Sequence, residues 1–349
     1  MKSSVSFNPD KLRLLRESCA LSQSRVSREV GISQAALSKF EKGVLEPSEE
    51  TLCQLAEYFH FPPEWFRGDD GDIPSGLVFH RKRAALTATI RTRLEAEAKL
   101  RLIDVAKMLK PEERISNVVK HENRSPADAA RALRKHWGLA TGKPVDNLVS
   151  LLERNSILVL PFDFGTDKID GFFLSLGFDF FCIALNDSSV FTPDRRRFTL
   201  AHELGHAILH RESFPDPEVE KEADEFAAEL LAPAASIRKD FSIPITLKSL
   251  AQLKSKWKIS MAAVLYRART LDVIDDKTWR RLCIYLSTLG YRKREPLCGL
   301  SPERPELLTQ IIEDTKKRIG TTPIWQYLQL EEDVFHQRYG GITAQEEMT

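Results

Sequence analysis

Two histidines and a glutamate lie within about one helical turn of each other in the segment RRRFTLAHELGHAILH, residues 195–210. His202 and His206 are four positions apart, so on a helix both imidazoles reach one point, with Glu203 turned about 100° to the side. Two neutral imidazole nitrogens can bind zinc and leave room for a third protein ligand and a water molecule. A carboxylate beside that water can accept its proton. The spacing predicts a hydrolytic zinc site with Glu203 as general base; the alternative is a helix with two incidental histidines.

The third zinc ligand must come from another helix. His210 continues the same face, but eight residues at 1.5 Å each place it about 12 Å from His202 along the axis, too far to share one ion. The segment VEKEADEFAAELLAP, residues 219–233, has a second helical pattern. Winding it at 100° per residue places Glu220 in the middle of an apolar face, where a carboxylate is costly unless it is paired or binds metal. We predict Glu220 as the third ligand; the alternative is an ion pair with a buried arginine.

The other residues of this segment divide between two faces of the predicted helix. Asp224 lies one turn after Glu220 and can accept a hydrogen bond from a ligand histidine, which would fix the tautomer of that ring. The alternative for Asp224 is an ordinary acidic residue on a helix surface. We expect the apolar face to hold Ala223, Ala227, Leu230 and Leu231, with Phe226 at its margin, and the solvent face to hold Glu218, Glu222, Glu225 and Glu229.

Together, these two segments resemble the ImmA/IrrE-type metallopeptidase domain, in which HExxH and a downstream ExxxD pattern build a gluzincin-like zinc site. The resemblance covers roughly residues 125–271, including the preceding IDGFF and IALN segments, and both motifs match in the residues that would touch zinc. It implies a zinc endopeptidase. In this family the domain is associated with site-specific cleavage of a helix-turn-helix repressor, which relieves repression under stress or during induction of a mobile element.

The first 66 residues have the pattern of five short helices with a helix-turn-helix spacing. Ser22 caps one helix, Gly31 makes the turn, and SQAALSKFEKG forms the next helix, which ends at Gly43. Val26, Val30, Ile32, Leu37 and Phe40 are expected to point inward. The polar face that remains suits base edges and phosphates, with Gln23 against a phosphate; its predicted DNA contacts are Gln23, Ser33, Gln34, Ala35, Ser38 and Lys39.

This N-terminal segment resembles the XRE/Cro-type, lambda-repressor-like DNA-binding domain over its whole length, most specifically in GISQAALSKFEKG. The alternative is a helical bundle that binds protein. A second segment, residues 247–271, has a weaker helix-turn-helix texture, with Ile259 and Ser260 at the turn and Tyr266 and Arg267 on the second helix. We expect it to pack behind the peptidase site rather than to bind DNA.

Several further elements are needed to position these sites. A long helical pattern ends before Pro111, and its charged residues are interpreted as a solvated face. Ser125 and Pro126 begin another helix, and β-rich segments between Ile157 and Asp187 predict three short strands. The predicted fold is mainly α with a small β-sheet (α+β). Its domains are an HTH domain at 1–68, a helical linker at 69–124, a metallopeptidase domain at 125–290 and a helical region of unknown role at 291–349.

Composition adds little to the functional assignment. Basic and acidic residues number 51 and 50, so any DNA contact must come from a local patch. The five cysteines include no CxxC pair, which argues against a disulfide framework or a thiolate zinc site. Neither a signal peptide nor a membrane span is recognisable, and a cytoplasmic protein is expected.

The sequence as a whole predicts a DNA-binding transcriptional regulator with a zinc peptidase domain. Its expected partners are double-stranded DNA, a protein substrate such as an HTH repressor or its own chain, and a second copy of itself in a homodimer. The alternative is an HTH repressor whose zinc domain is a non-catalytic sensor or structural module.

Overall fold

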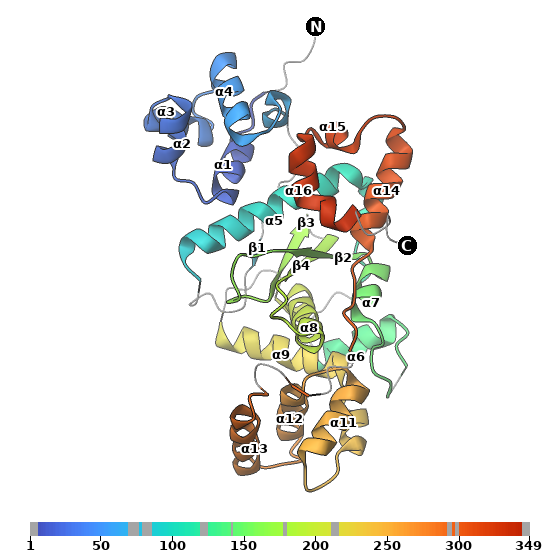
Figure 1. Ribbon diagram of the computed structural model, residues 1–349. Coiled ribbons are helices and arrows are strands. Elements are labelled where there is room, and N and C mark those ends of the chain that lie inside the picture. Colours follow the sequence, from blue (N-terminus) through green and yellow to red (C-terminus); the bar gives the residue numbers. More distant parts are fainter. Residues whose placement is uncertain are drawn as a thin grey trace.

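The computed structural model describes residues 6–68, 77–78, 86–118, 125–140, 142–176, 180–210, 216–291, 295–296 and 300–343, and the structural statements here concern those residues. The N-terminal helices lie at one end of the molecule and α11–α13 at the other, with a small sheet between them (Figure 1). The α+β fold class predicted from the sequence is confirmed. No helix in the described ranges is long and apolar enough to cross a membrane.

The N-terminal helices form the predicted helix-turn-helix arrangement. The Ser22 and Ser33 hydroxyls cap α2 and α3 by accepting hydrogen bonds from backbone N–H groups in the first turn of each helix. Gly31 ends α2 in the left-handed conformation at φ 78°, which a residue with a Cβ adopts only with strain. The fifth helix is a single 3-10 turn. The elements are α1 Pro9–Ser18, α2 Gln23–Val30, α3 Gln34–Glu41, α4 Glu49–Phe59 and η1 Pro63–Phe66.

The sheet has one strand more than the sequence predicts. Its order is β1-β3-β4-β2, with β2 parallel to β4 and the other neighbours antiparallel. The extra strand, β1, contains two residues from the segment assigned to the linker, too few to show an alternating pattern. The strands are β1 Leu77–Val78, β2 Ile157–Phe162, β3 Gly171–Leu176 and β4 Phe180–Asn186.

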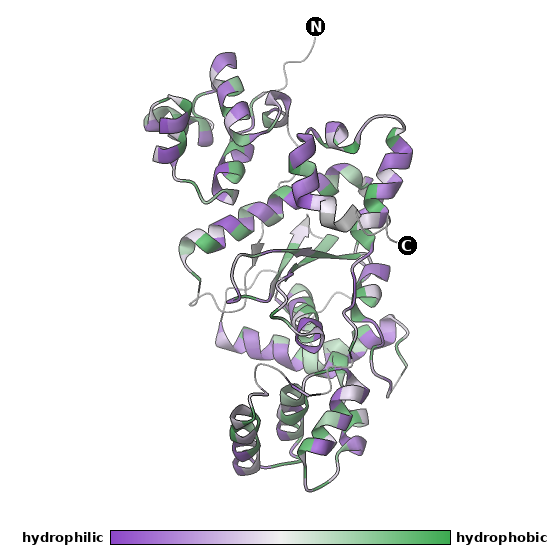
Figure 2. Ribbon diagram, in the orientation of Figure 1, coloured by the Kyte–Doolittle hydropathy of each residue, from purple (hydrophilic) through white to green (hydrophobic). Residues whose placement is uncertain are grey.

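Alternate side chains of this sheet enter two different hydrophobic cores. Leu158 and Leu160 of β2 pack into a core shared with the N-terminal helices and the C-terminal helices. Ile157 and Val159 point the other way, into a core shared with α6–α9 and α11–α13. Since successive residues of a strand face opposite sides, a strand that is apolar throughout must be covered on both. The hydropathy colouring shows hydrophobic strands near the centre of the molecule and hydrophilic residues along α9 (Figure 2).

The helix between the HTH domain and the sheet is α5 (Ala88–Met108), and it is more buried than the sequence predicts. Every residue from Leu100 to Ala106 is buried, including Arg101 and Asp104. The interpretation of its charged residues as a solvated face is therefore wrong for Arg101 and Asp104. The helix contacts α1, α14 and α15. Its two buried charged residues are paired, Arg101 with Glu97 and Asp104 with Arg338.

The C-terminal helices are part of the first core. Asp104 of α5 accepts hydrogen bonds from Arg338 at 3.1 Å and from the Tyr339 hydroxyl at 2.8 Å. Leu308, Ile312 and Phe335 are buried in the same core. The region of unknown role thus helps to hold α5 in place; its helices are α14 Leu307–Ile319, α15 Ile324–Leu328 and α16 Glu332–Thr343.

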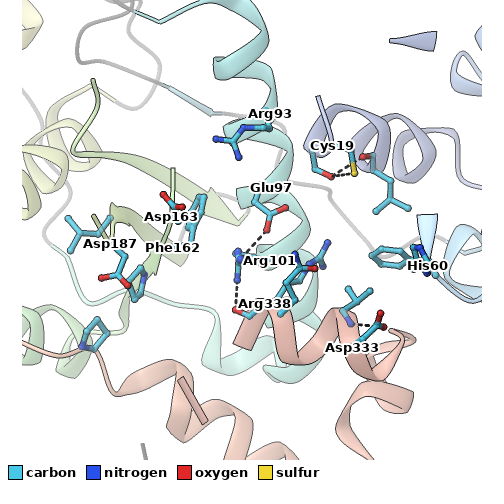
Figure 3. Close-up of a pocket in the computed structure, with 18 of the residues that line it drawn as sticks. Cys19, His60, Arg93, Glu97, Arg101, Phe162, Asp163, Asp187, Asp333 and Arg338 are labelled. Carbon is cyan, nitrogen blue, oxygen red and sulfur yellow. Dashed lines mark hydrogen bonds and ion pairs between the residues drawn. The ribbon is translucent and has the colours of Figure 1, made fainter. Parts of the chain in front are cut away.

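A cavity of about 1000 Å³ lies where these parts meet (Figure 3). Cys19 and His60 of the HTH domain lie on one side, and Phe162 and Asp163 at the end of β2 lie on the other. Arg101 of α5 lies between them, paired with Glu97 at 3.0 Å and stacked over Phe162. Paired charges and aromatic rings therefore line the junction between the HTH domain and the sheet.

The remaining helices surround the second core. Ser125 caps α6 and Pro126 occupies its first turn, as expected. Their bounds are η3 Pro111–Glu113, α6 Pro126–His136, α7 Leu148–Arg154, α8 Pro193–Leu209, α9 Pro217–Leu231, α10 Ala234–Ile237, η4 Arg238–Asp240, α11 Leu247–Trp257, α12 Met261–Thr270 and α13 Asp276–Thr288.

Candidate metal centre and DNA-contacting helices

Helices α8 and α9 carry the residues of the candidate metal centre, and a glycine lets them approach closely. An ideal Cβ built on Gly205 of α8 would lie 3.3 Å from the Ala223 Cα and 3.1 Å from the Phe226 ring of α9. Any larger residue would push the two helices apart. Sequence reasoning did not assign a role to Gly205, although a glycine inside a helical pattern is itself a sign of close packing.

Three side chains converge between these helices. The Nε2 atoms of His202 and His206 are 3.0 Å apart. Glu220 of α9 places Oε2 at 3.6 Å from His202 Nε2 and Oε1 at 3.4 Å from His206 Nε2. Among the described residues, these three form the group of histidine, cysteine and acidic side chains whose ligand atoms could hold a metal ion.

The geometry of this group fits a tetrahedral metal ion. Ligand atoms at about 2.0–2.1 Å from a tetrahedral metal lie about 3.3 Å from one another. Here the two Nε2 atoms are 3.0 Å apart, and the nearest Glu220 oxygen lies 3.6 Å from that of His202 and 3.4 Å from that of His206. Both histidines are fully buried, whereas the Glu220 side chain is 27% exposed, so solvent reaches the group from the α9 side. Three ligands and an accessible fourth position are typical of a hydrolytic metal site.

The protonation states of the group suit metal binding. Burial lowers the pKa of His206 to about 4, so its imidazole is neutral at pH 7 and keeps a lone pair for a metal. Burial alone would raise the pKa of Glu220, but hydrogen bonds and charge interactions with His202 and His206 outweigh it and hold that pKa below its usual range. The site therefore presents a neutral His206 imidazole and an ionised Glu220 carboxylate.

The other residues of the predicted zinc site lie around this group. Asp224 Oδ1 is 2.8 Å from His202 Nδ1, the ring nitrogen that faces away from Glu220, where a carboxylate can orient the imidazole. Glu203 is 1% exposed and follows His202 directly on α8. His210 lies outside the three-residue group, with Nε2 at 2.6 Å from Glu222 Oε2.

One residue of α9 contradicts its predicted place. Glu229 was expected on the solvent face but is 2% exposed. Its carboxylate pairs with Arg267 of α12 and lies 3.2 Å from Arg131 of α6. The hydrophobic periodicity of the sequence identifies the face that α9 packs against one neighbour. Because α9 also packs against α6, a second face of the helix is covered as well.

The predicted DNA-contacting residues lie on α2 and α3. Ser33, Gln34, Ala35 and Lys39 are exposed, whereas Gln23 and Ser38 are half-buried. The Gln34 side-chain amide donates a hydrogen bond to Gln23 Oε1 at 2.9 Å. The Ser33 hydroxyl is occupied as the cap of α3.

A buried glutamate behind this surface was not predicted. Glu41 accepts a hydrogen bond from Gln23 at 2.9 Å and pairs with Arg16 of α1, whose Nε lies 2.5 Å from Glu41 Oε1. It lies four residues after Leu37 on the buried face of α3, so the reasoning that singled out Glu220 could have found it. Glu41 fixes the orientation of Gln23, which in turn holds Gln34.

The segment at 247–271 forms two helices, α11 and α12, and α12 contacts α9. Arg267 is 5% exposed, and its guanidinium pairs with Glu229 and donates to the Ala232 carbonyl at 3.2 Å. A buried arginine cannot contact DNA. Ile259 and Ser260 lie in the turn as predicted, between Lys258, which ends α11, and Met261, which begins α12, and Ser260 caps α12.

Comparison with known proteins identifies the same two regions. A family model described as helix-turn-helix matches residues 12–66. A second model, the Peptidase_M78 family, described as IrrE N-terminal-like domain, matches residues 152–269. No curated protein matches the chain. The chain therefore combines an XRE-type helix-turn-helix DNA-binding domain with an IrrE/ImmA-like metallopeptidase-type domain of the Peptidase_M78 family.

Proposed function

We propose that this protein is a DNA-binding transcriptional regulator whose second domain is an active zinc endopeptidase that cleaves an HTH repressor or its own chain. The observation that supports this most directly is the convergence of His202, His206 and Glu220 with a buried Glu203 on the same helix as the two histidines. A site that only stabilises the fold needs neither a general base nor an accessible coordination position.

Zinc is the metal that this set of ligands suits best. Two imidazoles and one carboxylate at tetrahedral spacing match the His₂Glu sets of zinc hydrolases. When bound, zinc would polarise the scissile carbonyl and lower the pKa of a water molecule toward 7.

The chain's own residues would then carry the proton transfers. Glu203 would accept a proton from the attacking water and deliver it to the leaving amine. Asp224 would hold the His202 ring in the tautomer that leaves Nε2 available as a ligand. Water reaches these groups from the side on which Glu220 and Asp224 are partly exposed.

In the HTH domain, Gln34 and Lys39 would read bases or phosphates from the exposed face of α3, with Ser33, Ala35 and Ser38 beside them. Gln23, held by Glu41, would contact a phosphate. A homodimer would match a two-fold operator.

The peptidase proposal is tested by Glu203→Gln. This variant should keep its zinc and its fold, because Glu203 is not a ligand and glutamine has nearly the same shape. Its proteolytic rate should fall by about 100- to 10,000-fold, the usual contribution of general acid–base catalysis. We would express wild type and variant with an HTH repressor encoded beside the gene, apply DNA-damaging or oxidative stress, and follow fragments of both proteins by immunoblot.

Glu218→Gln is the matched control, since the same chemical change then falls on a side chain that is 65% exposed. It should cleave like wild type. Equal cleavage by wild type and Glu203→Gln would reject the peptidase assignment. A zinc-loaded wild-type protein that cleaves neither the repressor nor itself would favour the sensor function.

A further inference from the structure

The cavity of about 1000 Å³ at the junction of the HTH domain and the sheet has the size and the position of a ligand site (Figure 3). Its volume is at the upper end of the range for small-molecule pockets. β2 and β4 are parallel, and the residues that directly follow them, Asp163 and Asp187, line the cavity. The carboxyl ends of parallel strands are a common place for ligands to bind. His202, His206 and Glu220 do not line this cavity, so it is separate from the candidate metal centre.

Two arginines of α5 approach the end of β2. Arg93 donates a hydrogen bond to the Phe164 carbonyl. Arg101 lies two helical turns later, and its guanidinium carbon is 5.1 Å from the centre of the Phe162 ring. Both arginines line the cavity, with Glu97 between them on the helix (Figure 3). Helix α5 thus places two cations at the end of this strand.

A third arginine reaches the same place from α8. Arg196 pairs with Asp187 at 3.4 Å and donates to the Ser188 carbonyl at 3.1 Å. The Asp187 backbone N–H donates to the Phe162 carbonyl at 3.1 Å, which joins the ends of β2 and β4. The three arginines therefore surround one strand end, although they come from two helices far apart in the sequence.

These arginines keep hydrogen-bond donors that the protein does not use. Within the described part of the chain, the Nε atoms of Arg101 and Arg196 are buried and have no hydrogen-bond partner. Arg101 as a whole is 7% exposed. For Arg93, the hydrogen bond found among the described residues is to an uncharged carbonyl. A guanidinium has five N–H groups and no acceptor, and a buried donor without an acceptor is costly. The lining therefore has donors available for a ligand.

The carboxylates of the lining, in contrast, each have a donor within the protein. The pairs are Glu97 with Arg101 at 3.0 Å, Asp163 with the Gly165 backbone N–H at 2.7 Å, Asp187 with Arg196 at 3.4 Å, Glu303 with the Leu148 backbone N–H at 2.9 Å and Asp333 with the Val334 backbone N–H at 2.8 Å. The hydrogen-bonding capacity that remains is mainly that of donors. Guanidinium donors bind carboxylate and phosphate oxygens most strongly.

Aromatic side chains form another part of the lining. Phe59 and Phe61 belong to the HTH domain, and Phe162 lies on the side of the sheet. All three are largely buried. An apolar ring placed between these walls gains from burial, and contacts between aromatic rings add to that gain.

We propose that this cavity is an effector site that binds a small organic oxyanion, a carboxylate or phosphate group attached to a ring. The oxyanion is held by Arg93, Arg101 and Arg196, and the ring lies against the phenylalanines. Because the walls come from both the HTH domain and the sheet, the affinity for the ligand depends on how the HTH domain is placed, so the ligand also changes the affinity for DNA. The binding step does not depend on the proposed peptidase function.

Binding can be measured with ring compounds that differ mainly in charge. The probes are phenyl phosphate, benzoate and the uncharged benzamide, each titrated into the full-length wild-type protein by isothermal calorimetry. We expect phenyl phosphate and benzoate to bind about tenfold or more tightly than benzamide, because charge-assisted hydrogen bonds are stronger than those between neutral groups.

Substitutions of the two half-buried arginines locate the site. Arg93→Gln and Arg196→Gln leave the buried Arg101 in place, so the fold should survive, and each should weaken binding of phenyl phosphate about tenfold or more. Arg195→Gln is the matched control, since Arg195 is next to Arg196 on α8 but pairs with Asp170 outside the cavity. It should bind like wild type. Circular dichroism shows whether each variant is folded.

Promoter DNA tests the effector role. Saturating phenyl phosphate should change the affinity of wild type for its own promoter region about fivefold or more, whereas benzamide at the same ionic strength should not. Arg196→Gln should lose this effect.

Equal binding of all three probes overturns the site, as does tight binding that Arg93→Gln and Arg196→Gln leave intact, which is the result expected for an anion bound to zinc. Tight binding without a change in promoter affinity overturns the effector role. A wild-type protein that binds no promoter DNA would contradict both the proposed regulator and the effector role, while calorimetry by itself decides whether the site exists.

Discussion

One carboxylate decides the composition of the candidate metal centre. Helix α9 carries several acidic residues, but Glu220 is the one placed within 3.6 Å of both His202 and His206. Glu222, two residues later, points to His210 instead. If these three residues are the ligands, removing any one of them leaves too few for tight zinc binding.

At this residue scale, we expect His202→Ala, His206→Ala and Glu220→Ala each to lose most of the zinc that wild type holds at close to one ion per protomer. Asp224→Ala should retain the ligands and lower zinc affinity by about 10- to 100-fold. Glu222→Ala is the control and should keep its zinc. Metal content of the purified variants provides the measurement; full zinc in Glu220→Ala together with loss in Glu222→Ala would transfer the ligand role to Glu222.

At the scale of elements, one face of α3 is exposed and the residues of its opposite face are held by contacts within the HTH domain. Leu37 and Phe40 are buried, and Glu41 links α3 to α1 through Arg16 and to α2 through Gln23. The Gln34 side chain is held by a hydrogen bond to Gln23. Part of the conformational entropy that this side chain would lose on binding DNA is therefore already lost in the free protein. Lys39 is exposed one turn later.

Gln34→Ala and Lys39→Ala should each weaken binding of the full-length protein to its own promoter region by about 1–3 kcal/mol. Loss of Lys39 should also reduce the salt dependence of binding if it contacts a phosphate. Footprinting and titration on promoter DNA measure this effect. Lys239→Ala, an exposed change in η4, is the control; unchanged affinity in both α3 variants would exclude this helix as the reader.

At the scale of the whole molecule, the C-terminal helices connect the two cores across the sheet. Glu303 pairs with Arg197 of α8 and accepts hydrogen bonds from the first backbone N–H groups of α7. Glu153 of α7 accepts a hydrogen bond from the Glu306 backbone N–H at 2.9 Å, at the start of α14. These contacts tie the tail to the metallopeptidase-type domain, and α14–α16 in turn pack on α5.

The burial of Glu153 makes stability depend on pH. Burial raises the pKa of Glu153 from 4.5 to about 7, although backbone hydrogen bonds act in the opposite direction. The folded state therefore prefers the protonated carboxyl group. Its stabilising contribution is fully present below pH 4.5 and is lost as pH rises to about 7.

Glu153→Gln should remove this pH dependence, because glutamine stays neutral and can still accept from Glu306. Above pH 7 the variant should be more stable than wild type by about 1–3 kcal/mol, whereas at pH 4.5 the two should be nearly equal. Denaturant unfolding between pH 4.5 and 8 measures the difference, with the exposed Glu57→Gln as control. A variant that is less stable than wild type by the same amount at every pH would show that the pKa of Glu153 is not raised in the folded protein.

Local features of the chain could be predicted from the sequence by itself. The spacing of His202, Glu203 and His206, the serine caps of α2 and α6, and the left-handed Gly31 depend on residues within one or two helical turns. The three apolar strands were recognisable for the same reason. Glu220 was singled out by its place on an apolar face, but its role as a ligand remains a prediction.

Only the tertiary structure decided which surfaces of each helix are covered. Glu229 and α5 looked solvent-facing because periodicity describes one face of one helix and contains no information about a second neighbour. The pairing of β1 with β3, the Glu41 link to Gln23 and the cavity between the HTH domain and the sheet all join residues far apart in the sequence. Such contacts depend on how completed elements pack together. Burial makes an isolated charge costly and a paired charge tolerable, so the packing also decides which charged residues can be buried.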